Sequence, residues 1–260
     1  SVIYPDQPAG DTMFMRFVQL GIKPEATVAF ERFYNHRVGP TLLKVDGCVF
    51  AQLIRSTEHE SEFISFTLWK TQEQAETYED STQYGDLIKE NVPFEAVSNE
   101  WKIQLTEDNT LEYKPVRNEP VIKALPVVAG SSLEDAPNKL NGAPYIRLLM
   151  AQVNPERFEE LSDTYSKVIT PALLQTEGCQ AAYLIGMKEK SEGLSLTIWD
   201  SQELAAAYES SGRFAEMMQK VSPFLSSWYQ WKMTLDPSKQ ERVHTSGEVS
   251  IKGYKVVSGS

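Results

Sequence analysis

One stretch of this sequence occurs twice. Residues 66–81 read FTLWKTQEQAETYEDS, residues 196–211 read LTIWDSQELAAAYESS, and eight of the sixteen aligned residues are identical. A similar shift aligns residues 39–54 with residues 170–185, and the register holds over roughly 90 residues with one gap. A period of about 130 residues is too long for a solenoid repeat. It predicts two fused copies of a small domain.

The repeat divides the chain into two domains and two arms. We expect the first domain at residues 13–105 and the second at residues 144–235. Residues 106–143 are rich in Pro, Gly and Asn, which disfavour a helix, so they are expected to form a linker or extended arm. Residues 236–260 contain the alternating segment GEVSIKGYKVV and are expected to form a C-terminal arm.

Each copy begins with a predicted strand and a predicted helix. Residues 12–22 are apolar and rich in strand-forming residues. Pro24 then suits the first turn of a helix, where its missing N–H costs nothing. Gly39–Pro40 in the first copy and Pro171 in the second are expected to interrupt this helix.

The second half of each copy predicts a hairpin, a helix and a last strand. Residues 48–56 and 63–69 alternate as strands do, and Thr71 or Ser201 can cap the helix that follows. The segments WKIQL, residues 101–105, and WKMTL supply the last strand. The order β-α-β-β-α-β is that of the ferredoxin-like unit. We therefore predict an α+β fold of two tandem ferredoxin-like units whose antiparallel sheets cover each other, because a bare apolar sheet face would be a large exposed patch.

The segments FYNHRVGPTLLKVDGC, SFTLW and TQEQAETYEDS resemble the antibiotic biosynthesis monooxygenase (ABM) family of the dimeric α/β-barrel superfamily. The resemblance covers about residues 13–105 and again about 144–235. In that superfamily two units pair through their sheets into a barrel, with a pocket between the sheet and the helices of each unit. For this chain the resemblance implies an intramolecular pseudo-dimeric α/β barrel.

Two pairs of repeated residues are candidates for binding a substrate. Trp69 and Trp199 end the third strand of each copy, and the resemblance implies that they line the pocket; a large aromatic residue at a strand end can also simply close the core. Arg16 and Arg147 lie among apolar residues of the first strand. Such an Arg can face a pocket and hold an oxyanion, or it can point to solvent or form a salt bridge between the units.

A further set of residues could move a proton. Tyr34 and Tyr165 match each other on the first helix, and a phenol beside a pocket can donate a hydrogen bond or a proton. At helical spacing the same residues can be core with a polar tip. His36 occurs only in the first copy and can act as a general base or be solvated. We take Tyr34 and His36 as catalytic candidates and Tyr165 as a candidate for substrate binding.

No cofactor is expected. His, Cys and carboxylate residues show no metal-ligand spacing, and neither a GxGxxG nor a Walker motif is present. Haem-degrading relatives carry an axial His on the second helix, but residues 84–94 and 214–224 contain none. Met217 and Met218 could ligate haem iron, although adjacent Met residues on a helix usually belong to the core.

The charge limits the classes of partner that the protein can bind, and the cysteine content indicates its redox compartment. A net charge of −11 argues against nucleic acid and anionic membranes, and no apolar run approaches the ~20 residues of a membrane helix. Cys48 and Cys179 favour two buried thiols in a reducing, cytoplasmic compartment, with a single disulfide between the copies as the alternative. The linker and tail arms would suit strand exchange, so a homodimer of the fused chain is also expected.

Two classes of function stay open. The resemblance implies a cofactor-independent monooxygenase, or a related enzyme, acting on an aromatic or other hydrophobic small molecule. The alternative is a protein without catalytic activity that binds a small molecule or uses the duplicated barrel as a scaffold. Fold alone does not decide between them.

Overall fold

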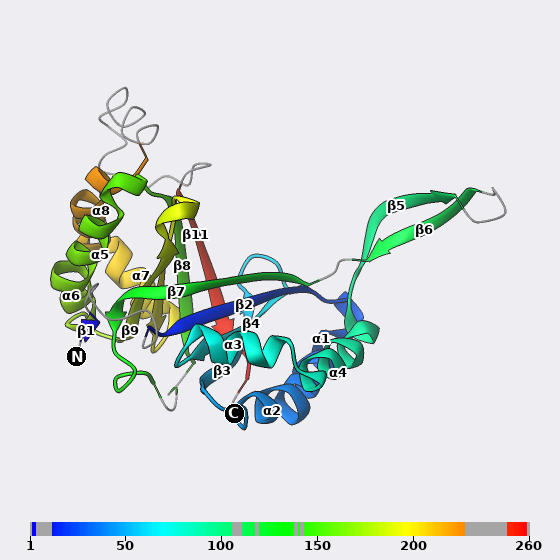
Figure 1. Ribbon diagram of the computed structural model, residues 1–260. Coiled ribbons are helices and arrows are strands. Elements are labelled where there is room, and N and C mark those ends of the chain that lie inside the picture. The colour runs from blue at the N-terminus through cyan, green and yellow to red at the C-terminus, as the bar shows by residue number, and fades with distance from the viewer. Residues whose placement is uncertain are drawn as a thin grey trace.

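The computed structural model consists of two halves that share one β-barrel, with the helices on its outside (Figure 1). It describes residues 2–3, 12–105, 111–117, 120–137, 140, 143–226 and 249–258. The strands are β1 (Val2–Ile3), β2 (Phe14–Gly21), β3 (Cys48–Ser56), β4 (Glu62–Trp69), β5 (Val97–Leu105), β6 (Leu111–Arg117), β7 (Val121–Ser131), β8 (Tyr145–Gln152), β9 (Cys179–Met187), β10 (Glu192–Trp199) and β11 (Val249–Val256). The α-helices are α1 (Thr27–Phe33), α2 (Gly39–Leu42), α3 (Gln72–Glu79), α4 (Thr82–Asn91), α5 (Phe158–Thr164), α6 (Thr170–Leu174), α7 (Gln202–Ser210) and α8 (Arg213–Val221). Two π-helical segments are η3 (Tyr34–Val38) and η6 (Tyr165–Ile169), and the 3-10 turns are η2 (Pro24–Ala26), η4 (Val92–Phe94), η5 (Pro155–Arg157), η7 (Lys188–Lys190) and η8 (Ser222–Phe224).

Eight of the described strands close the barrel. Their order is β7-β2-β4-β3-β11-β8-β10-β9, and β7 pairs with β9 as well as with β2, which closes the sheet on itself. All of these pairs are antiparallel. Each half has the strand order of a ferredoxin-like sheet, with the last strand beside the first. The predicted fold, two ferredoxin-like units in one intramolecular barrel, is confirmed.

The fourth strand of each unit differs from the expected one. In the first unit β7, from the segment expected to be a linker, takes this position beside β2. β5, which contains the expected strand 101–105, instead pairs with β6 in a two-stranded hairpin that projects from the body (Figure 1). In the second unit β11, from the C-terminal arm, lies beside β8, and the expected segment 231–235 lies outside the described residues. An alternating pattern predicts a strand but not the strand it pairs with, because pairing depends on packing partners far away in the sequence.

The first helix of each unit is widened where an interruption was expected. Gly39 N donates to Tyr34 O, and Thr170 N donates to Tyr165 O, which are bonds across five residues. Pro40, which follows, has no N–H and its ring crowds the carbonyl four residues earlier, so a π turn lets the helix continue past it. The predicted caps of the second helix are confirmed: the side chain of Thr71 accepts from Gln74 N, and that of Ser201 accepts from Leu204 N.

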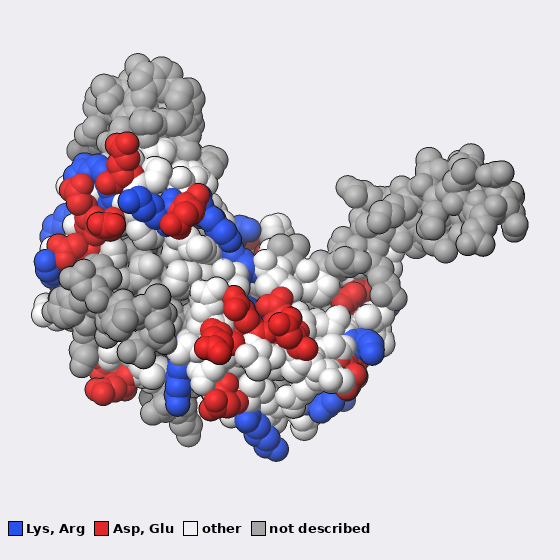
Figure 2. Space-filling view, in the orientation of Figure 1, with Lys and Arg blue, Asp and Glu red and all other residues white. Residues whose placement is uncertain are grey.

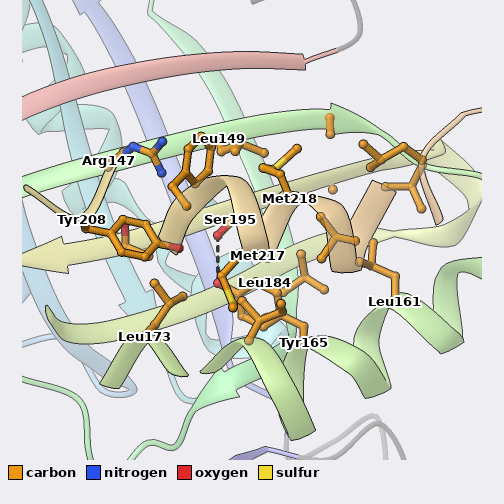
Figure 3. A pocket seen from close by; sticks show the side chains of 18 residues that line it. Arg147, Leu149, Leu161, Tyr165, Leu173, Leu184, Ser195, Tyr208, Met217 and Met218 are labelled. Atoms are coloured by element: carbon orange, nitrogen blue, oxygen red, sulfur yellow. Dashed lines mark hydrogen bonds between the residues drawn. The ribbon is translucent and has the colours of Figure 1, made fainter. Parts of the chain in front are cut away.

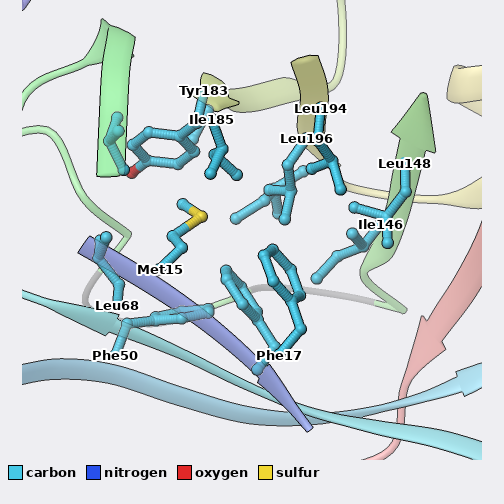
Figure 4. Packing of buried hydrophobic residues seen from close by; sticks show 14 of the residues in the cluster. Met15, Phe17, Phe50, Leu68, Ile146, Leu148, Tyr183, Ile185, Leu194 and Leu196 are labelled. Atoms are coloured by element: carbon cyan, nitrogen blue, oxygen red, sulfur yellow. The ribbon is translucent and has the colours of Figure 1, made fainter. Parts of the chain in front are cut away.

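Apolar side chains from both units fill the middle of the barrel (Figure 4). Phe17 and Phe66 of the first unit stack with ring centroids 5.4 Å apart, and Ile146 and Leu196 of the second unit are fully buried in the same cluster. Full burial of one such side chain stabilises the fold by about 1.5–3 kcal/mol. The inner faces of the two sheets therefore form one shared core, and the outer faces are left to pack against the helices.

The two cysteines are free thiols. Cys48 is buried and Cys179 is half-buried, and burial raises the pKa of each thiol to about 12. The alternative of a disulfide between the copies is therefore wrong. Over the described residues, no helix has the length and apolar character that crossing a bilayer requires.

Candidate functional site

Each unit has a pocket between the outer face of its sheet and its helices. We call the pocket of the second unit the β8 pocket and that of the first unit the β2 pocket. The empty space in each, counted together with its solvent-filled mouth, is about 610 Å³ and about 500 Å³. Both are lined mainly by apolar side chains. Each also receives one arginine from the first strand of its unit, Arg147 from β8 and Arg16 from β2.

Arg147 is the charged group of the β8 pocket. The residue is 6% exposed, and its guanidinium carbon lies 3.9 Å from the ring centroid of Phe214 on α8. Its Nη2 lies 3.6 Å from Oε1 of the half-exposed Glu209, which is an ion-pair distance but too long for a hydrogen bond. Nε and Nη2 are buried without a hydrogen-bond partner. Burial lowers the pKa of Arg147, yet a guanidinium stays charged at neutral pH, so this pocket holds a cation that is ion-paired with Glu209 but has two nitrogens without a hydrogen bond.

Arg16 repeats this arrangement in the β2 pocket. It is 3% exposed, its guanidinium carbon lies 4.7 Å from the ring centroid of Tyr84, and Nε lies 3.5 Å from Oε2 of Glu79. Nε and Nη2 of Arg16 also lack a hydrogen-bond partner. Both ion pairs stay within one unit, because Glu79 ends α3 and Glu209 lies on α7. A buried donor without a hydrogen-bond partner lowers the stability of the fold by about 1–3 kcal/mol, and by more when the donor is charged. An anionic ligand would satisfy these groups.

Tyr34 and Tyr165 line the pockets from the π-helical segments. Tyr165 Oη is 2.8 Å from Ser195 Oγ and donates to Tyr183 O at 3.2 Å, and Figure 3 shows the Tyr165–Ser195 bond between the two ends of the β8 pocket. Tyr34 Oη lies 3.4 Å from Ser65 Oγ. Burial raises the pKa of both phenols well above the usual value. Both are therefore protonated at neutral pH and do not act as bases.

Trp69 and Trp199 lie behind the pockets. Both are fully buried, and neither is among the residues that line a pocket. Each packs against a tyrosine that does line one: Trp69 stacks on Tyr78 at 5.3 Å between centroids, and Trp199 lies 5.2 Å from Tyr208. A strand end places the indole under the helix rather than in the cavity. These Trp residues were expected to line the pockets, but in the structure they lie behind the lining residues and do not face the cavities.

His36 lies away from both pockets, contrary to its place among the catalytic candidates. It is exposed, and its Nδ1 is 2.8 Å from Arg32 O of the same helix. Residues two apart on a helix point in different directions, so the burial of Tyr34 turns His36 outward. Tyr84, Phe214 and the Ser65/Ser195 pair do line the pockets but were not singled out from the sequence.

The lining of the two pockets limits the chemistry they can do. Among the described lining residues none is Asp, Glu or His, so no side chain there is a base at neutral pH. What each pocket offers is a guanidinium, protonated phenols and apolar surface. This set suits an apolar molecule that carries, or develops, a negative oxygen.

Two segments of the chain, residues 13–90 and 144–220, match the family model of the antibiotic biosynthesis monooxygenases. The chain belongs to this family. The match covers more than half of the sequence and falls once in each unit, as the repeat predicts. The ABM resemblance stated from the sequence is thereby confirmed.

Solved structures share this fold over nearly the whole chain. A protein of Lactobacillus acidophilus NCFM described as a candidate monooxygenase has a TM-score of 0.61 and 9% identity, and the alignment covers 95% of this chain and 94% of that one. A second candidate monooxygenase, from Fusobacterium nucleatum subsp. nucleatum, has a TM-score of 0.60 and 8% identity over 95% and 93%. An anthrone oxidase-like protein has a TM-score of 0.53 and 13% identity over 98% and 94%. At this identity the likeness shows the fold. No curated protein matches the sequence.

Proposed function

We propose that this ABM protein is a cofactor-independent monooxygenase for an electron-rich, hydrophobic small molecule. The observation that carries the proposal is the buried guanidinium in each apolar pocket, with two N–H-bearing nitrogens that lack a hydrogen-bond partner. Membership of the ABM family and the names of the structural relatives support the same class of reaction.

The guanidinium would make the bound substrate more acidic. A positive charge in an apolar pocket stabilises an enolate or phenolate oxygen, which lowers the pKa of the bound substrate. The proton would pass to solvent at the mouth, since the lining supplies no base. The carbanion form of the substrate then forms a C–O bond to O2. Loss of a second C–H proton and cleavage of the O–O bond give a ketone and water, and the four electrons that reduce O2 all come from the substrate.

The remaining pocket residues would position the substrate. The phenol of Tyr165 stays protonated, and it would donate to the peroxide or ketone oxygen by turning away from Tyr183 O, which accepts its one hydrogen in this structure. Trp199 supports Tyr208, which lines the same pocket, and so acts as a positioning residue. Tyr34, Trp69 and Arg16 would have the same roles in the β2 pocket.

A second candidate function is binding without turnover. The absence of Asp, Glu and His from the described lining of both pockets favours it. A protein that only carries an apolar anion would need the guanidinium and the apolar walls but no base. The two functions differ in whether O2 is consumed.

Oxygen consumption in the presence of anthrone tests the proposal, because the conversion of anthrone and O2 to anthraquinone and water is the reaction class proposed. We expect the protein to accelerate O2 uptake, and the double variant Arg16→Gln/Arg147→Gln to lose about 10²–10³-fold of that rate. His36→Gln, outside the pockets, is the matched control and should keep the full rate. Binding of anthrone without any acceleration of O2 uptake would favour the carrier function instead.

A further inference from the structure

The floors of the two pockets differ at one strand pair. In the first unit Leu20 of β2 lies opposite Phe63 of β4, and in the second unit Ala151 of β8 lies opposite Gly193 of β10. The repeat makes these pairs equivalent. The nearest atoms to the space where Gly193 lacks a Cβ are side-chain carbons of Val153, at 3.0 Å, and of Leu161 and Leu184, both at 3.9 Å. The second unit therefore lacks the large ring that the first unit has at this position.

The helix above this pair differs in the same direction. Phe30 on α1 packs edge-to-face against Phe63, with centroids 5.2 Å apart and planes at 75°, and both rings are almost fully buried. The equivalent of Phe30 on α5 is Leu161. In the first unit the two rings build a wall from helix to sheet. In the second unit a leucine and a glycine occupy these positions.

The β8 pocket is correspondingly longer. Along β10 it is lined by Thr197, Ser195 and Gly193, whereas along β4 the β2 pocket is lined by Thr67 and Ser65 only. At about 3.3 Å per residue, the four steps from Gly193 to Thr197 span roughly 13 Å, and the two steps from Ser65 to Thr67 span about 7 Å. Figure 3 shows Arg147 and Leu161 at opposite ends of the β8 pocket, with the Tyr165–Ser195 hydrogen bond between them.

We propose that the two pockets select ligands of different length. The β8 pocket takes an elongated apolar anion, with its charged oxygen at Arg147 and its body extending to Gly193. In the β2 pocket the Phe30–Phe63 wall stops such a molecule, so that only a short anion reaches Arg16. The inference rests on the proposed function in that it treats both pockets as ligand sites, but it concerns binding alone.

Two rigid carboxylates, benzoate and the longer biphenyl-4-carboxylate, test the proposal by methyl NMR titration of the full chain. Methyl groups of Met217 and Met218 report on the β8 pocket, and those of Val38 and Ile88 report on the β2 pocket. We expect benzoate to shift both sets and biphenyl-4-carboxylate to shift only the first set. Arg147→Gln should weaken biphenyl-4-carboxylate at least tenfold, and Arg16→Gln should leave its affinity within twofold.

Two variants, Leu161→Phe and Ala151→Leu, introduce the residues of the first unit, Phe30 and Leu20, at the equivalent positions and should close the end of the β8 pocket. Each should weaken biphenyl-4-carboxylate at least tenfold and leave benzoate within threefold, and thermal unfolding identifies the variant that is folded. The proposal is overturned if biphenyl-4-carboxylate shifts both sets, if neither probe binds, or if the folded closing variants bind it as the parent does. Unequal binding without O2 uptake would instead contradict only the proposed monooxygenase function.

Discussion

The indole Nε1 of Trp199 donates a hydrogen bond of 2.9 Å to Oγ1 of Thr197, two residues earlier on the same strand. The first unit has the same bond, 2.8 Å long, between Trp69 and Thr67. Alternate residues of a strand share a face, so the hydroxyl lies where the indole N–H needs a buried acceptor. The bond fixes the ring on which the pocket tyrosine packs.

Removing the threonine hydroxyl should lower the stability of the fold in either unit, but only its removal from Thr197 should weaken ligand binding in the β8 pocket. Thr197→Val leaves the indole N–H unsatisfied, and we expect the free energy of unfolding to fall by about 1–3 kcal/mol in urea denaturation. It should also loosen Tyr208 and weaken ligand binding in the β8 pocket. Thr67→Val is the matched control: a similar loss of stability with unchanged binding in the β8 pocket is expected. Equal loss of binding in both variants would argue against a positioning role for Trp199.

The buried arginine should be dispensable for folding. Arg147→Met replaces a desolvated cation with an apolar side chain, and Glu209, its partner, is half-exposed and would remain hydrated. Such replacements are often neutral or stabilising by about 1–4 kcal/mol. Urea denaturation should show an unchanged or higher free energy of unfolding, while ligand binding in the β8 pocket is lost. A loss of several kcal/mol would mean that the cation serves the fold.

The seam between β7 and β9 should not tolerate a single added methyl group at Gly130. Gly130 has φ of +119°, and a Cβ there would collide with the backbone of Ala182 and Tyr183 on β9. Gly130→Ala should destabilise the chain by roughly 3 kcal/mol or more, from strain and from forcing the paired strands apart. Gly85→Ala on α4 meets no atom within 4 Å and should be neutral or stabilising by about 0.5–1 kcal/mol. Urea denaturation of both variants compares them, and equal stability would contradict tight closure at this seam.

Stability should fall in alkaline solution. Burial raises the pKa of Tyr34, Tyr165 and Tyr183 above its usual value, and that of Cys48 and Cys179 to about 12. In the unfolded chain these groups lose protons near pH 8.5 for Cys and 10 for Tyr. The unfolded state then binds fewer protons than the native state, so the free energy of unfolding decreases as the pH rises.

Urea denaturation between pH 7.5 and 10.5 measures this effect. The stabilisation is fully present below about pH 8 and should decline through pH 9 and 10. A Cys48→Ala/Cys179→Ala variant lacks the thiol contribution and should decline less steeply between pH 8.5 and 10. A flat profile over the whole range would contradict the buried, protonated state of these side chains.

The repeat and its periodicity were enough to predict the fold, because burial patterns within each copy determine which segments are strands and which are helices. They could not predict that β7 rather than β5 pairs with β2, since that choice depends on contacts with β9 in the other half of the chain. Arg16 and Arg147 could be proposed because a charge among apolar strand residues is unusual. The missing hydrogen bonds of their nitrogens, and the outward direction of His36, depend on side-chain geometry that sequence spacing does not contain.

Covalent fusion of the two half-barrels changes what a single mutation can do. When a barrel forms from two identical chains, each substitution appears in both pockets, so the pockets cannot become different. Here both halves belong to one polypeptide, β7 and β11 each pair with strands of both halves, and Phe63 and Gly193 are encoded separately. One half can therefore accumulate changes while the other preserves an older specificity. In the fused barrel, a substitution in one pocket does not have to occur in the other, as it must in an assembly of two identical chains.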